Sequence, residues 1–172
     1  MQNNSELETA LLRLEKISEE TQKSIQKSNK QWGHIANKMG KLVEDIVLPG
    51  IKPVINEYFK CKIIKSYPNA SSILNGQDYE LDLLALSTDK AFLTEVKSTV
   101  RQSYIDDLVM KKLVDFHKFF PEYKHLKPIP VISSISIPES MVKYATKKNV
   151  YAMIWRNYDY LDIVNFNEVN IK

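Results

Sequence analysis

The chain is poor in cysteine, with only Cys61 among its 172 residues. A single cysteine excludes a disulfide within the chain and a zinc site built from several cysteines. No apolar run approaches the roughly 20 residues that a helix needs to cross a bilayer. The N-terminus is polar and acidic, unlike a secretory signal. We therefore expect no membrane association and a cytoplasmic location.

A strong excess of one charge is also missing. The 24 basic and 21 acidic residues leave a formal net charge of +3. This balance permits a nucleic-acid partner but does not by itself indicate one. Hydrophobic residues make up 44% of the chain, which is enough to predict a packed core.

Proline is absent before Pro49, and the first 48 residues have one continuous helical pattern. Ser5 and Glu8 resemble a capping box at its start. Apolar residues recur at alternating spacings of four and three, as in a coiled coil, with polar interruptions at Ser18, Thr21 and Ser28. The apolar members of this heptad seam are Leu7, Leu11, Leu14, Ile25, Trp32, Ile35, Met39, Leu42 and Ile46.

A single long helix cannot bury such a stripe alone, so the seam predicts a partner. The favoured hypothesis is a homodimer or higher oligomer formed by a coiled-coil arm over residues 1–37. A helix folded back on its own domain, or a frayed arm, is the alternative, because Gly33 and Gly40 weaken the helix.

Residues 38–172 are expected to form one α/β domain. The patterns predict a break or kink at Pro49-Gly50, a strand at 62–65 ended by a turn at 67–69, and a tight turn at Asn75-Gly76. Strands are predicted at about 78–87 and 91–98, and then a helix from 103 to about 120. The remaining predictions are a strand at 130–137, a helix at 138–148 and strands at 150–155 and 160–165.

Two of these apolar strands carry charged residues where a buried strand should have none. Asp82 lies in the first, and Glu95-Val96-Lys97 ends the second. Glu95 and Lys97 are two residues apart, so their side chains point to the same face of a strand. Asp82 on a neighbouring strand could meet them. Buried charges are usually paired or bound to a metal, so the pattern predicts a divalent-metal site, with a buried ion-pair cluster as the alternative.

An Asp at the end of one strand and Glu-X-Lys on the next, in an α-β-β-β-α-β order, resembles the PD-(D/E)XK nuclease superfamily. The preceding stretch Gly40-Lys41-Leu42-Val43-Glu44 resembles the Gly-x-x-x-Glu helix start of archaeal Holliday-junction resolvases. The resemblance covers roughly residues 38–165. Leu81 stands in place of the proline that gives the family its name.

The resemblance implies a restriction-endonuclease-like core, with a mixed central sheet flanked by helices and preceded here by the coiled-coil helix. It also implies Mg²⁺- or Mn²⁺-dependent hydrolysis of DNA phosphodiester bonds. The catalytic set would be Glu44, Asp82, Glu95 and Lys97. Metal ligands would be Asp82, Glu95 and the Val96 carbonyl oxygen, with Glu44 and Glu80 as accessory ligands.

Basic residues after the proposed site are candidates for phosphate contacts, which are mainly electrostatic. They are Arg101, Lys111 and Lys112. A solvated helix face is the alternative for the two lysines. A nuclease fold that has lost cleavage and serves as a nucleic-acid-binding or coiled-coil assembly module remains the competing hypothesis for the whole chain.

Overall fold

The computed structural model describes the backbone of residues 2–156 and 160–169, and the side chains of residues 11–156 and 160–169. The chain forms two compact units, Met1–Met39 and Gly40–Lys172. The helix α1, Gln2–Tyr58, extends through both units. Among the described residues, no helix is long and apolar enough to span a membrane.

The first unit consists of α1 residues up to Met39. Its apolar seam side chains from Leu11 onward are exposed in the single chain, including Leu14, Ile25 and Trp32. The side chains of Leu7 and of the predicted capping box, Ser5 and Glu8, lie outside the described residues. The structure therefore contains the predicted helix. The coiled coil itself stays a prediction, because it requires a second chain.

The second unit is built on a six-stranded mixed sheet in the order β1-β2-β3-β4-β5-β6. The strands β1 to β3 are antiparallel, β4 and β5 run parallel to β3, and β6 is antiparallel to β5. Their bounds are β1 Lys65–Leu74, β2 Gln77–Leu86, β3 Lys90–Val96, β4 Lys127–Ser134, β5 Tyr151–Arg156 and β6 Tyr160–Ile163.

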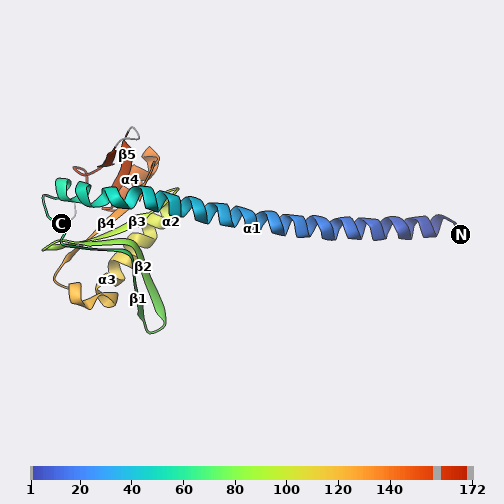
Figure 1. Ribbon diagram of the computed structural model, residues 1–172, viewed down its shortest axis with the longest axis horizontal. Helices are drawn as coiled ribbons and strands as arrows, with labels where there is room; N and C mark the ends of the chain where they lie inside the picture. Colours follow the sequence, from blue (N-terminus) through green and yellow to red (C-terminus); the bar gives the residue numbers. More distant parts are fainter. Residues whose placement is uncertain (1, 157–159, 170–172) are drawn as a thin grey trace. The chain divides into compact units, whose positions relative to one another are not determined.

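Helical layers cover both faces of this sheet (Figure 1). On one face, α1 residues after Gly40 pack against the strands through Val47, Ile51 and Ile55. The other face is covered by α2 Gln102–Asp107, the π-helical turn η1 Leu108–Lys112, α3 Leu113–Phe119 and α4 Glu139–Lys147. A 3₁₀ turn, η2 Pro121–Tyr123, precedes β4. The predicted α/β class and α-β-β-β-α-β order are present.

Two local predictions around prolines are wrong. The predicted strand at 62–65 and turn at 67–69 are replaced by β1, which includes Pro68 and Asn69. Because β1 is the edge of the sheet, a proline there does not break a central ladder. The predicted break at Pro49-Gly50 is also missing, since α1 continues through Pro49 and Pro53. Burial of Val47, Ile51 and Ile55 against the sheet outweighs the helix-breaking tendency of the prolines.

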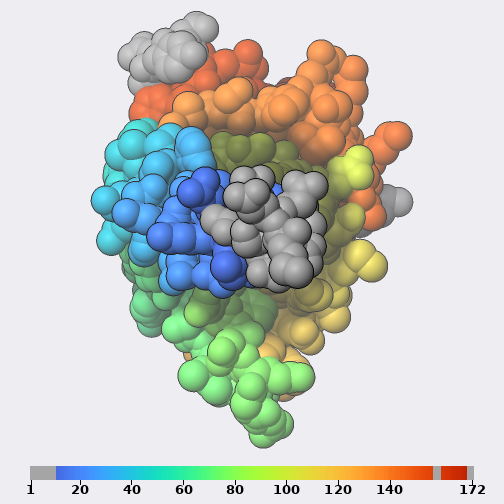
Figure 2. Space-filling model, turned by 90° about the vertical axis from the view of Figure 1, so that its right-hand side faces the viewer, coloured from blue at the N-terminus to red at the C-terminus, as the bar shows by residue number. Residues whose placement is uncertain are grey.

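The predicted tight turn at Asn75-Gly76 is confirmed. Leu74 pairs with Gln77, and both turn residues have positive φ, 51° and 73°. This is the geometry of a two-residue hairpin whose twist matches that of its strands. The hairpin tip protrudes from the second unit (Figure 2).

Candidate active site

The candidate site lies where β2 separates from β3, at a position where the β1–β2 ladder omits one pair. The β2–β3 ladder ends at Leu83 paired with Thr94, so Asp82 and Glu95 fall just beyond its last pair. On the other side, the β1–β2 ladder omits the position of Asp82, opposite Asn69, whose φ is +50°. Asp82 therefore has no partner residue in either ladder.

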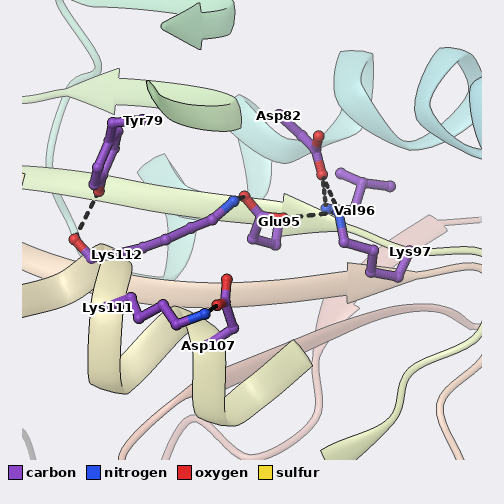
Figure 3. A network of polar contacts seen from close by, with 8 residues as sticks. All are labelled: Tyr79, Asp82, Glu95, Val96, Lys97, Asp107, Lys111 and Lys112. Atoms are coloured by element: carbon purple, nitrogen blue, oxygen red, sulfur yellow. Dashed lines mark hydrogen bonds and ion pairs between the residues drawn. The ribbon is translucent and has the colours of Figure 1, made fainter. Parts of the chain in front are cut away.

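Asp82 bridges the opening between the two strands. Its Oδ2 accepts a hydrogen bond from the Val96 backbone N–H at 2.6 Å. The carboxylate thus takes the acceptor role that a strand carbonyl would otherwise have, which fixes its orientation (Figure 3). No partner for the second oxygen, Oδ1, is found among the described residues.

Lys97 joins the two carboxylates. Its Nζ lies 3.0 Å from Asp82 Oδ2 and 2.7 Å from Glu95 Oε2 (Figure 3). Burial lowers the pKa of Lys97, but the adjacent Glu95 and Asp82 carboxylates together raise it by more than burial lowers it. The net result is a pKa above 10.5. Lys97 is consequently a cation throughout the neutral range. The predicted convergence of Asp82, Glu95 and Lys97 is present in the structure.

A second lysine, Lys112, completes a row of four charged side chains: Asp82, Lys97, Glu95 and Lys112. Lys112 Nζ lies 2.5 Å from Glu95 Oε1, so each Glu95 oxygen contacts one ammonium. Glu95 is almost fully buried, with 5% of its side chain exposed. The sequence predicts a phosphate contact for Lys112, whereas the structure pairs Lys112 with Glu95. No pattern in the sequence signals the π-helical turn that brings Lys112 to the sheet.

The backbone of Lys112 is held from the sheet as well. Tyr79 on β2 donates a hydrogen bond from its hydroxyl to the Lys112 carbonyl oxygen at 2.7 Å. Burial raises the pKa of Tyr79 well above 10, and the Glu95 and Asp115 carboxylates add to the shift, so the hydroxyl keeps its proton. A cavity of about 400 Å³ lies beside Tyr79, Lys111 and Lys112.

Glu44 approaches from α1 without joining the row. Burial raises its pKa above 4.5, the charge of Asp82 adds to this, and the charge of Lys97 opposes it. Glu44 therefore lies in the electrostatic field of the site, but it makes no hydrogen bond or ion pair with another described residue. Glu80 is exposed and lines a cavity of about 300 Å³ next to Asp82.

The other predicted phosphate contacts lie outside this row. Arg101 is exposed and immediately precedes α2. Lys111 pairs with Asp107 at 2.8 Å on the helix surface, and 76% of its side chain is exposed. The structure therefore places Lys111 and Lys112 in different settings although they are neighbours in sequence.

The chemistry of the donors can be compared with the needs of Mg²⁺. In the described part of the chain, no three Asp, Glu, His or Cys side chains gather closely enough to hold a metal ion. Mg²⁺ commonly uses only one or two carboxylates, with waters and substrate phosphate oxygens completing its octahedron. Asp82 and Glu95 form such a pair of hard oxygen donors, joined by one cation, Lys97. The residues present fit Mg²⁺ or Mn²⁺, provided that Lys97 moves aside.

Comparisons with known proteins give one structural likeness. No protein-family model and no curated protein match the sequence. The chain is similar to the small subunit of the heterodimeric restriction endonuclease R.BspD6I, with 18% identity and a TM-score of 0.35. The match covers 62% of this chain and 63% of that subunit, so this chain spans less than two thirds of the length of its structural neighbour.

Proposed function

We propose that the second unit is a metal-dependent endonuclease of the PD-(D/E)XK type that hydrolyses phosphodiester bonds in DNA. The observation that carries the proposal is the convergence of Asp82, Glu95 and Lys97 where β2 and β3 separate. The α-β-β-β-α-β order around these residues, which the superfamily resemblance implies, supports it.

The superfamily resemblance implies the roles, and the contacts of Asp82, Glu95 and Lys97 support the central ones. Asp82 and Glu95 would hold a divalent cation, with the Val96 carbonyl oxygen as a further ligand and Glu44 and Glu80 as accessory ligands. A bound cation would neutralise the charge of the phosphate and promote ionisation of a water. Lys97, a cation directly after the end of β3, would orient the attacking water or stabilise the charge that develops on the phosphate. Arg101 and Lys111, both exposed, would contact DNA phosphates.

One observation favours a second candidate function. Two carboxylates and two ammonium groups already balance each other in the row Asp82, Lys97, Glu95 and Lys112. Such a row can persist without any metal, as expected for a nuclease fold that binds nucleic acid or supports assembly without cutting.

Cleavage assays distinguish the two. Purified protein is incubated with supercoiled, linear, single-stranded and branched DNA in Mg²⁺ or Mn²⁺. We expect cleavage that EDTA abolishes, and a loss of at least about 100-fold in Glu95→Gln and Lys97→Met, because each removes a group assigned to charge neutralisation or water activation.

The matched controls are Glu139→Gln and Lys143→Met. These residues form an exposed ion pair on α4 and should leave cleavage unchanged. Circular dichroism confirms that each variant is folded. A wild-type protein that cuts none of these DNAs but still binds them would favour the non-catalytic module.

A further inference from the structure

The two lysines of the row contact Glu95 in different ways. Lys97 Nζ touches both carboxylates and therefore occupies the space between Asp82 and Glu95. Lys112 Nζ contacts Glu95 alone, on the other oxygen, Oε1. A divalent cation shared by Asp82 and Glu95 must take the place of Lys97, whereas Lys112 can remain where it is.

The fold devotes specific features to placing Lys112. The helix after β3 widens into a π-helical turn at Leu108–Lys112, a rare feature that is often found at functional sites. The Tyr79 hydroxyl fixes the Lys112 carbonyl oxygen, and Leu108 anchors the same turn in the core with no exposed surface. Lys111, which directly precedes Lys112 in the sequence, instead pairs with Asp107 on the surface.

Because Glu95 is buried, the charge of Lys112 has a strong effect on the Glu95 carboxylate. Glu95 is nearly inaccessible to water, so its charge is balanced by protein groups rather than by solvent. When Lys97 leaves Oε2, Lys112 on Oε1 still contacts the carboxylate and keeps it oriented. The positive charge of Lys112 also repels a divalent cation bound between Asp82 and Glu95, because screening of charges in such a buried place is weak.

We propose that Lys112 is a positioning residue that holds Glu95 through Oε1, presents Oε2 toward Asp82, and lowers the affinity of this carboxylate pair for divalent cations. The inference rests on the proposed function, because it takes Asp82 and Glu95 as the cation-binding pair. Lys112 acts through its contact with Glu95 and through the repulsion between its charge and the cation, without binding the cation itself. It would make the site release its metal readily and depend on substrate phosphate for full occupancy.

The test measures Mn²⁺ binding to the full chain without DNA, by isothermal titration calorimetry. Lys112→Gln removes the charge but keeps an amide that can donate to Oε1, and Lys112→Arg keeps both charge and donor. We expect Lys112→Gln to bind Mn²⁺ roughly fivefold or more tightly than wild type. Lys112→Arg, for which the neighbouring cavity provides room, should bind within about twofold of wild type.

Lys143→Gln is the matched control, since it loses the same charge from an exposed ion pair on α4, and its Mn²⁺ affinity should not change. Lys112→Met adds a cleavage readout: tighter Mn²⁺ binding together with slower cleavage, because Glu95 loses its second contact. A fold defect would weaken both Mn²⁺ binding and cleavage. Tighter binding together with slower cleavage is therefore a result that a purely structural role of Lys112 cannot give. If Lys112→Met does not fold, Lys112→Gln supplies both measurements.

The outcomes separate the two proposals. Wild type that binds Mn²⁺, loses binding in Glu95→Gln, and binds equally or more weakly in Lys112→Gln overturns the role of Lys112 and leaves the nuclease proposal standing. Absence of Mn²⁺ binding in both wild type and Lys112→Gln overturns the role of Lys112, and the cleavage assay with Mg²⁺ or Mn²⁺ then decides the nuclease proposal. Binding in Lys112→Gln alone supports the role of Lys112, because the wild-type site would then need substrate phosphate to hold its metal.

Discussion

At the scale of single residues, the geometry of the site depends on the contacts that each charged side chain makes. Glu95 is buried and contacts two lysines, and Asp82 accepts a backbone hydrogen bond as well as the Lys97 ammonium. Removing one member of a buried pair leaves an uncompensated charge, which is costly. The Asp82 and Glu95 carboxylates are therefore held by the same contacts that stabilise this part of the sheet.

A different polar cluster, away from this row, offers a pH prediction. The Tyr58 hydroxyl at the end of α1 donates to Asp162 on β6, and Arg156 also contacts that carboxylate. The hydrogen bond to Asp162 is the largest cause that raises the pKa of Tyr58 to about 12, and burial adds to it. A raised pKa means that the folded protein holds this proton more tightly than the unfolded chain. The stabilisation is complete below pH 10 and is lost as the pH rises from 10 toward 12.

We therefore expect Tyr58→Phe to lower the free energy of unfolding by about 1–2 kcal/mol at pH 8. The difference from wild type should shrink between pH 10 and 12. Urea unfolding at several pH values measures both quantities, and Tyr160→Phe, an exposed tyrosine, serves as the control. A difference that stays constant up to pH 12 would contradict the assignment.

At the scale of elements, the sequence predicts regular structure better than its irregular parts. The strands around Asp82 and Glu95 follow from apolar runs, and the Asn75-Gly76 turn follows from residues that tolerate positive φ. The π-helical turn has no comparable signature, so Lys112 could not be assigned to Glu95. Likewise, Pro68 and Asn69 indicate a turn by local preference, but an edge position in the sheet allows them within β1.

The π-helical turn can be tested through its partner on β2. Tyr79→Phe removes the hydroxyl that donates to the Lys112 carbonyl oxygen but keeps the ring packing against Phe119 and Phe120. We expect a loss of about 1 kcal/mol in the free energy of unfolding, because a hydrogen bond in a poorly hydrated place is lost. Hydrogen exchange should increase in residues 108–113 and remain as in wild type in α4. Unchanged exchange in the turn would show that Tyr79 does not hold it.

At the scale of the whole molecule, the heptad seam of α1 is the feature that bears on assembly. The heptad seam predicts the helix, and the structure leaves Leu14, Ile25 and Trp32 exposed on it. We propose that a second copy of the chain covers this stripe in a coiled coil, because the 4-3 spacing is the pattern that two supercoiled helices bury. A dimer would bring two sites to one DNA molecule, which suits cleavage of both strands or of a branched substrate.

The seam gives a prediction that links assembly to activity. Wild type should have about twice the chain mass of 20.0 kDa by light scattering at micromolar concentration. Ile25→Glu places a charge in the seam and should give a monomer, whereas Gln26→Glu adds the same charge at a position off the seam and should leave the dimer intact. If two sites act together, Ile25→Glu should convert supercoiled DNA mainly to nicked circles while wild type also produces linear DNA. A monomeric wild type would contradict the coiled coil, and equal linear product from both proteins would show that each site cuts independently of its partner.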